Sequence, residues 1–377
     1  MQARFHPSIE EIDPVSWDRL VKDHNPFLQH AFLAAMERQG CVGDHFGWSP
    51  NHLAVYDENR LLGASPLYIK NNSYGEFVFD HAWADAYRRA GLTYYPKLVS
   101  SIPYTPATGN RLLIDSEADV DSVTREMVRT IHEWLKVQGV SSMHWLFTEN
   151  EEAGRLRSLG MLERQGVQFH WPNRGYGDFE AFLGALKAKR RKNIRRERRK
   201  VAEQGFTFRR IPGSQVTAWE WQLFADYYAK TFQERYSLPT FNAAFFQEIG
   251  KTLGDQVILV LADLERQPVA GALLYRSDSV LYGRHWGGAS EYDSLHFETC
   301  YYQGIEYAIE QGLDRFEPGA QGEHKIWRGF LPTMTRSHHL ITDGRFQAAI
   351  DDFLQRETPA IVNYYANLSE SSPYSKP

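Results

Sequence analysis

The chain has 377 residues, of which 42% are hydrophobic and 24% charged, and its net charge is -5. This length exceeds the usual size of one domain, and the composition excludes a disordered chain and favours two globular units. The two cysteines, Cys41 and Cys300, have neither zinc-site nor disulfide-framework spacing, so we expect no metal site and a reducing compartment.

The sequence contains no segment typical of secretion or membrane insertion. Glu10, Glu11 and Asp13 are acidic where a signal peptide would be basic and then apolar. No later stretch approaches the roughly 18 apolar residues that a membrane span needs. We therefore expect a cytoplasmic protein with no transmembrane segment, which leaves only peripheral contact with a membrane open.

In chain order, the first half predicts a hairpin, a helix and a strand. The hairpin covers residues 52–68 and turns at 57–60, where the sequence is polar. Apolar residues then recur at helical spacing from Val120 to Leu135, up to Gln138-Gly139, where the glycine is typical of a helix end. A strand follows at residues 140–147.

The second half begins with a predicted strand at residues 166–171 and a long basic helix over 179–204. It then repeats the order of the first half. A hairpin covers residues 257–275, a strand 281–286, a helix beginning near Phe297 ends at Gln311-Gly312, and a strand covers 313–317. We therefore predict two α/β units in tandem, over residues 1–165 and 166–377, in the element order of N-acetyltransferases.

A resemblance to a known family is carried by six segments, residues 79–87, 95–98, 103–112, 295–303, 319–325 and 328–332. In these segments the chain resembles the FemAB-like predicted N-acyltransferases, also called peptidoglycan biosynthesis/recognition proteins. The resemblance implies two acetyltransferase-like units, each with a mixed, mainly antiparallel sheet flanked by helices, and transfer of an acyl or aminoacyl group to an amine.

The resemblance leaves the acyl donor open. It implies no tightly bound cofactor, but acyl-CoA, an acyl-carrier thioester or aminoacyl-tRNA as co-substrate. The acceptor it implies is an amine of a cell-envelope precursor, a lipid or a small metabolite.

Direct acyl transfer needs a base for the amine proton and hydrogen-bond donors for the developing oxyanion. We expect the base to be His285 or Glu317, and the sequence does not choose between them. Neither cysteine has an evident histidine partner in the sequence, so covalent catalysis is not predicted. Gly287 and Gly288 are expected to expose backbone N–H groups that bind an anionic oxygen, unless they only form a turn.

The segment after Glu317 reads as a strand end that leads into a short helix. A polar face at i, i+3, i+4 and i+7 spacing indicates a second group of site residues, although a solvated helix face would look the same. We expect His324 to be catalytic and the others to bind substrate. The four residues on this face are Gln321, His324, Lys325 and Arg328.

Further candidates depend on weaker patterns. Tyr282, Asp80, His81 and Glu298 are predicted to bind substrate, although the Asp80-His81 pair could be a core feature and Glu298 could stabilise a first helical turn. Thr108 and Arg111 could bind phosphate or only form part of a turn that contains prolines and a glycine.

The basic helix contains the strongest charge signal of the chain. Between Lys187 and Lys200, ten of the fourteen residues are basic and one is acidic, a local charge of +9 on a chain that is otherwise acidic. An apolar seam of Leu183, Leu186, Ile194 and Val201 predicts that the opposite face is exposed, either simply solvated or in contact with an anion. We expect a tRNA, nucleotide diphosphate or lipid head group there. The predicted anion-binding residues are Arg191, Arg195, Arg196 and Arg199.

Two functions fit these observations. The first is an amide-forming acyltransferase whose chemistry lies mainly in the second unit, because the ionisable cluster around Glu317 has no counterpart near Phe147. The alternative is a non-catalytic anion-binding module that presents the basic helix to a polyanionic partner.

Overall fold

The computed structural model describes residues 1–234, 236–320 and 322–375. These residues form two compact units, Met1–Val167 with Met334–Tyr365 (unit 1) and Gln168–Thr333 with Ala366–Pro377 (unit 2). The predicted boundary near residue 165 lies close to the first crossing between them. Residues 334–365 differ from the prediction, because we placed them in the second domain and they fold with unit 1.

The reason for this difference is strand pairing. Strand β15 (Leu331–Ile341) pairs antiparallel with β8 (Ser142–Leu146) of unit 1, from Ser337 opposite Leu146 to Ile341 opposite Ser142. Three elements, β9 (Leu162–Pro172), β15 and α12 (Gly344–Glu370), have residues in both units.

Unit 1 contains two sheets. One has the strand order β1-β3-β4-β7 and is antiparallel throughout. The other has the order β15-β8-β6-β5-β2, in which only β6 and β8 are parallel. The remaining elements of this unit are β1 (Gln2–His6), η1 (Ile9–Glu11), α1 (Pro14–Asp18), η2 (Lys22–His24), α2 (His30–Arg38), β2 (Trp48–Pro50), β3 (His52–Asp57), β4 (Arg60–Ser65), β5 (Leu67–Lys70), α3 (His81–Arg89), β6 (Lys97–Ser100), β7 (Leu113–Ile114), α4 (Val120–Gln138) and α5 (Asn150–Ser158).

Helix α4 shows how local sequence defines an element. Val123, Met127, Ile131 and Leu135 recur at helical spacing, and all four are buried in the core of unit 1. The helix ends at Gly139, whose φ of 65° is a left-handed conformation that glycine adopts at little cost. The predicted helix end is therefore confirmed.

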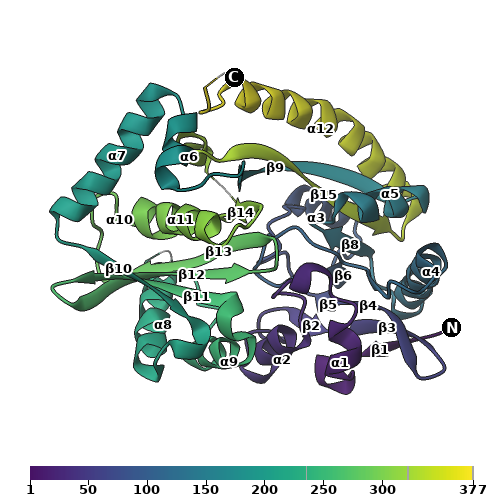
Figure 1. Ribbon diagram of the computed structural model, residues 1–377. Helices are drawn as coiled ribbons and strands as arrows, with labels where there is room; N and C mark the ends of the chain where they lie inside the picture. Colours follow the sequence, from purple (N-terminus) through teal and green to yellow (C-terminus); the bar gives the residue numbers. More distant parts are fainter. Residues whose placement is uncertain (235, 321, 376–377) are drawn as a thin grey trace. The chain divides into compact units, whose positions relative to one another are not determined.

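Unit 2 is built on one sheet of order β10-β11-β12-β13-β14-β9, in which only β13 and β14 run parallel. Helices α8 and α9 lie on one face, and α6, α7, α10 and α11 lie on the other (Figure 1). The elements are α6 (Phe179–Ala185), α7 (Ala188–Glu203), β10 (Thr207–Pro212), η3 (Gly213–Gln215), α8 (Ala218–Gln233), α9 (Ala243–Leu253), η4 (Gly254–Gln256), β11 (Val257–Leu264), β12 (Gln267–Arg276), β13 (Val280–Gly288), α10 (Leu295–Phe297), the π-helical turn η5 (Glu298–Tyr302), α11 (Gln303–Glu310), β14 (Arg315–Glu317) and η6 (Glu323–Arg328).

The basic helix is shorter than predicted. Residues 179–204 form two helices, α6 and α7, separated at Leu186, whose backbone is extended. Leu186 forms a bridge with Tyr374, and the N–H of Lys187 donates to the carbonyl of Pro373 at 2.9 Å. The C-terminal segment thus interrupts the helix. Among the residues that the structure describes, no helix combines the length and the apolar composition needed to cross a membrane.

Candidate functional site

In the sheet of unit 2, the two parallel strands β13 and β14 diverge near the middle of the strand order. Val280–Tyr282 of β13 pair with Arg315–Glu317 of β14, after which β14 ends while β13 continues to Gly288. A cavity of about 80 Å³ lies beside this divergence. Its lining comes from β12, β13, the α10–η5 helix and the residue after β14, namely Ala272, Leu273, Leu274, Gly283, Arg284, His285, Trp286, His296, Cys300, Tyr301 and Pro318.

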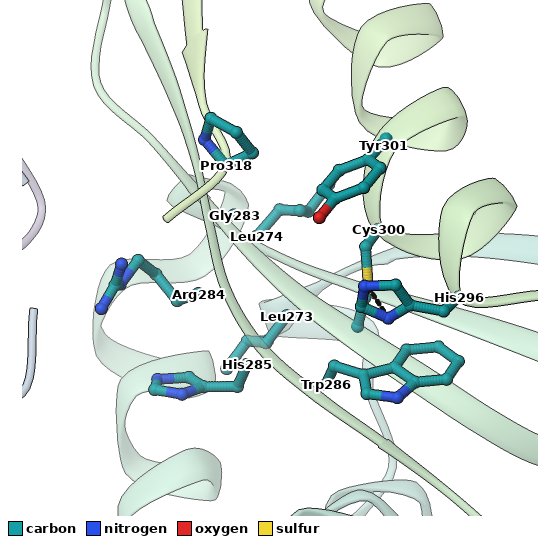
Figure 2. A pocket seen from close by; sticks show the side chains of 11 residues that line it. Leu273, Leu274, Gly283, Arg284, His285, Trp286, His296, Cys300, Tyr301 and Pro318 are labelled. Carbon is teal, nitrogen blue, oxygen red and sulfur yellow. Dashed lines mark hydrogen bonds between the residues drawn. The ribbon is translucent and has the colours of Figure 1, made fainter. Parts of the chain in front are cut away.

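A β-bulge orients the side chains of β13. Leu273 pairs with His285 and Leu274 pairs with Gly283, so Arg284 is the additional residue. The regular alternation of side chains along a strand therefore breaks within the predicted strand 281–286. Figure 2 shows the side chains of Arg284 and His285 on one side of β13 and Trp286 on the other, beside His296.

His285 lies among aromatic rings. Its ring centroid is 5.3 Å from that of Tyr228, 4.9 Å from that of Phe241 and 5.9 Å from that of Phe246. Burial, together with the charge of Arg284, holds the pKa of His285 well below its usual value. The imidazole is therefore neutral at pH 7, and it is a weak base where it stands.

The helix wall of the cavity carries three polar side chains that we did not predict as site residues. Cys300 Sγ is 3.4 Å from His296 Nδ1, and the Tyr301 hydroxyl is 3.2 Å from Nε2 of His324. Burial raises the pKa of both the Cys300 thiol and the Tyr301 hydroxyl. Both groups therefore keep their protons at neutral pH.

The signal for these residues was present in the sequence. His296 and Cys300 are four residues apart, which places two side chains together on a helix, yet we considered the histidine partner of each cysteine absent. Tyr301 is spaced with Phe297, Ile305 and Ala308 in an apolar stripe, which predicts only a buried residue, and it is buried, but it also lines the cavity.

The predicted short helix after Glu317 is η6, a 3₁₀-helix, in which residues i and i+3 lie one above the other. Lys325 and Arg328 therefore align and are both buried, and His324 is half-buried. Gln321 lies outside the described residues. The described residues of the predicted polar face are therefore not fully solvated, and the exposed residues of η6 are Glu323 and Trp327, of which Trp327 is 52% exposed.

The basic side chains of η6 have defined partners. Lys325 Nζ donates to the carbonyl of Gly319 at 2.8 Å, and burial, with Arg284 nearby, lowers the lysine pKa to about 7. Arg328 donates to Glu197 of α7 at 2.8 Å and to the carbonyl of His324 at 3.0 Å. Burial, Arg328 and Lys325 all lower the pKa of His324, so its imidazole is neutral at pH 7.

Glu317 is adjacent to the cavity in sequence but does not line it. Its carboxylate accepts a hydrogen bond from Arg315 Nε at 2.9 Å and lies 4.0 Å from His170 Nε2. Only 4% of its side chain is exposed. The segments around Tyr282 and Glu317 do adjoin, as expected, but Glu317 is engaged in an ion pair and Tyr282 is buried within the sheet.

The structure also shows the surroundings of two further predicted sites of unit 2, Glu298 and the Gly287-Gly288 pair. Glu298 is buried, where Arg198 donates to both carboxylate oxygens at 3.1 Å, and burial raises its pKa. Gly287 and Gly288 belong to the β12–β13 ladder rather than to a turn that exposes N–H groups. A side chain at position 287 would overlap the backbone of Tyr227 in α8, so close packing accounts for this glycine.

The remaining candidates lie in unit 1. Asp80 is buried, where it accepts hydrogen bonds from Lys97 and, at 2.6 Å, from the Tyr94 hydroxyl, whereas His81 is exposed. Thr108 is half-buried.

Arg111 also belongs to the core of unit 1. It is 1% exposed and donates to the carbonyls of Leu146, Ala107 and Asn110 at 2.7, 2.7 and 3.2 Å. These bonds commit its guanidinium to the fold, which corrects the expectation that Arg111 binds an anion.

The basic residues of α7 divide into two faces. Arg198 and Glu197 face the body of unit 2, where they pair with Glu298 and Arg328. Of the predicted anion-binding residues, Arg195 pairs with Glu180, Arg191 donates to the carbonyl of Gly184 at 3.3 Å, and Arg199 lies 3.7 Å from Glu203. Arg196 is exposed.

The comparisons with known proteins agree with this architecture. FemX has the same fold, with a TM-score of 0.53 at 12% identity over 93% of this chain and 100% of FemX. The C-terminal domain of a putative lysylphosphatidylglycerol synthetase from Agrobacterium fabrum gives a TM-score of 0.56 at 11% identity, over 92% of this chain and 97% of that domain. L-PGS from Bacillus licheniformis gives 0.51 at 12%, over 86% and 95%.

No curated protein sequence matches the chain. A family model does: the FemAB-like family, described as peptidoglycan biosynthesis/recognition, matches residues 8–376. The match covers almost the whole length, so it includes both units and every segment on which the resemblance was based. The chain therefore belongs to the FemAB-like family and has its tandem acetyltransferase-like fold.

Proposed function

We propose that unit 2 transfers an acyl or aminoacyl group from a thioester or aminoacyl-tRNA donor to an amine. The acceptor would be a cell-envelope precursor, a lipid or a small metabolite. The cavity at the divergence of β13 and β14 supports this proposal most directly, because it combines apolar walls with polar groups that can act on a carbonyl. The family description, peptidoglycan biosynthesis/recognition, supports an envelope precursor as acceptor.

Tyr301 and His324 would stabilise the oxyanion. The raised pKa of Tyr301 keeps its hydroxyl protonated, so it can donate a hydrogen bond to the carbonyl oxygen as negative charge develops there. Neutral His324, 3.2 Å away, can donate from Nε2 to the same hydroxyl, which strengthens the chain of hydrogen bonds. Lys325 and Arg328 would then bind substrate from the same turn.

The amine proton needs a base, for which we predicted His285 or Glu317. The His285 ring packs against Tyr228 and Phe246 on the side of β13 away from Trp286 and His296 (Figure 2), and its pKa is low, whereas Glu317 is ion-paired with Arg315 and does not line the cavity. The geometry therefore favours neither group, and both stay candidates for the base.

The test is an amide-forming assay with acyl-CoA, carrier-protein thioester and aminoacyl-tRNA donors and a mixture of amine acceptors, followed by mass spectrometry. Tyr301→Phe should lower kcat by about 10²–10³-fold, the usual effect of removing one oxyanion donor. Tyr307→Phe is the matched control, because Tyr307 lies on α11 and does not line the cavity. Absence of amide with every donor class would refute the proposal.

A second candidate function, binding of a polyanion, is favoured by the outer face of α7. Lys189, Lys192 and Arg196 recur at i, i+3 and i+7 and are exposed, opposite the buried Ile194 and Val201. In the described part of the chain no carboxylate forms a salt bridge with these three cations, although Asp293, which pairs with Lys200, is near enough to Arg196 for the arginine to lower the aspartate pKa. Their charges are therefore available to phosphates, as in a tRNA or a nucleotide diphosphate.

Charge reversal tests this second candidate. The Lys192→Glu/Arg196→Glu variant should weaken binding of a tRNA transcript at least about tenfold at low salt and reduce its salt dependence. The control is Lys251→Glu/Arg266→Glu, which reverses two exposed cations elsewhere in unit 2. Equal binding by both variants in mobility-shift titrations would eliminate α7 as the docking surface.

A further inference from the structure

The thiol and imidazole on the helix wall of the cavity have no part in the chemistry described so far. His296 and Cys300 both line the cavity, and Sγ lies 3.4 Å from Nδ1, within hydrogen-bonding range for sulfur (Figure 2). We propose that Cys300 is a nucleophile that holds the acyl group as a thioester, with His296 as its base, before the amine takes it. This inference rests on the proposed function of unit 2.

The surroundings of His296 hold its ring toward the sulfur. The ring lies edge-on to Trp286, with centroids 5.1 Å apart, and to Tyr301 at 5.6 Å. Aromatic contacts of this kind restrict rotation of the imidazole. In the tautomer that carries its proton on Nε2, Nδ1 presents a lone pair to the thiol.

The first step forms the thioester. His296 Nδ1 takes the thiol proton while Sγ forms a bond to the acyl carbon, and the bond from that carbon to the leaving group breaks. The proton on Nδ1 then passes to the leaving sulfur or oxygen, which departs as a thiol or an alcohol. The imidazole is neutral again, and Cys300 carries the acyl group.

The second step forms the amide. The amine nitrogen attacks the thioester carbon, and its proton moves to Nδ1 of His296. The C–S bond breaks and the proton returns to Sγ. The acyl group thus passes from donor to amine with no oxidant, reductant or additional reactant, and Tyr301 can donate to the carbonyl oxygen in both steps.

The state of the thiol explains why a base is required. Burial raises the pKa of Cys300, and Lys325 only partly offsets this effect, so the resting group is a thiol and not a thiolate. Attack by Sγ on the acyl carbon must therefore coincide with transfer of the thiol proton to a neutral base, as it does for serine nucleophiles. An imidazole one helical turn away provides that base.

Cys41 is a natural control. It is 0% exposed, lies in unit 1, and its thiol donates to the carbonyl of Gln39 at 3.9 Å rather than to an imidazole. Cys300 lines a cavity beside an imidazole, and Cys41 provides a buried thiol in a different setting.

The experiment is intact-protein mass spectrometry after mixing the full chain with p-nitrophenyl acetate, followed by peptide mapping. We expect one acetyl group on Cys300 in the unchanged protein and in Cys41→Ala, and none in Cys300→Ala. His296→Asn should slow acetylation by about a hundredfold, the usual contribution of a general base. Acetylation that maps elsewhere, or that persists in Cys300→Ala, would overturn the proposal. If Cys300→Ala does not fold, Cys300→Ser replaces it, and the measurement then asks whether the thioester at position 300 is lost.

The amide-forming assay separates this inference from the proposed function. If the unchanged protein forms amide and a folded Cys300→Ala variant does so at the same rate, the thioester route is wrong and the acyltransferase stands. If Cys300 is acetylated but no donor gives amide, the thioester site stands and the proposed function falls.

Discussion

Lys325 illustrates at the scale of one residue how burial tunes the chemistry of the site. The folded chain holds this lysine at a pKa of about 7, against an ordinary value of 10.5, because its ammonium group is removed from water and lies near Arg284. Near neutral pH the side chain therefore exists in both charged and neutral forms. Such a group can exchange a proton with a substrate in a way that an exposed lysine cannot.

This pKa shift predicts a pH-dependent stability. Between pH 7 and 10.5 the unfolded chain binds a proton at Lys325 that the folded chain releases, so the site makes folding more favourable as pH rises. Its cost is fully present below pH 7. Lys325→Met should therefore be more stable than the unchanged protein at pH 6, with the difference shrinking toward pH 10. Urea-unfolding midpoints measure this, with exposed Lys251→Met as the control. A difference that stays constant with pH would contradict the assigned pKa.

Single residues were the least predictable part of the site. The sequence shows that His285 is near the strand end, but not that Arg284 forms a bulge that turns both side chains to the same side, since that depends on the register with β12. His324 and Lys325 were found because polar spacing identified them. Cys300 could have been found by checking helical spacing to His296, which needs no structure.

At the scale of elements, close packing of a strand on a helix limits substitution. A Cβ atom at Gly287 would overlap the backbone of Tyr227, which cannot move without shifting α8. We expect Gly287→Ala to lower the free energy of unfolding by about 1–3 kcal/mol, as overpacking does. Gly184→Ala in α6, where a Cβ would meet no atom within 4 Å, should be neutral or stabilising by up to about 1 kcal/mol. Chemical denaturation of both variants decides this, and equal stability of the two would contradict the packing.

Elements defined by their own residues could be predicted from the sequence. Elements whose bounds depend on contacts with distant segments could not. The hairpins and the helix ends at Gly139 and Gly312 follow from apolar periodicity and from glycines with φ of 65° and 66°. The break between α6 and α7 depends on pairing of Leu186 with Tyr374, far along the chain. Likewise, nothing local distinguishes the 3₁₀-helix η6 from an α-helix.

At the scale of the whole molecule, the two units differ at the end of their parallel strand pair. In unit 2 the cavity lies where β14 separates from its parallel neighbour. In unit 1 the equivalent parallel pair is β6 and β8, and the Arg111 guanidinium donates to the carbonyl of Leu146 at the end of β8. A side chain thus occupies the position at which the other unit is open.

This asymmetry predicts that Arg111 supports the fold and not the reaction. Arg111→Met removes donors from three carbonyls, and we expect it to lower the free energy of unfolding by about 3 kcal/mol. The kcat of amide formation per folded molecule should not change. Arg125→Met, on the exposed side of α4, should alter stability by less than about 0.5 kcal/mol. A loss of kcat in a fully stable Arg111→Met variant would place unit 1 in the chemistry.

The route of the chain has a consequence for how this protein can be divided. The chain leaves unit 1 after Val167 and returns at Met334 with the strand that pairs with β8. A fragment ending at Val167 would leave that edge of β8 without its partner, and such edges recruit other chains and aggregate. Although the two halves look like repeats in sequence, expressing them separately should give insoluble material.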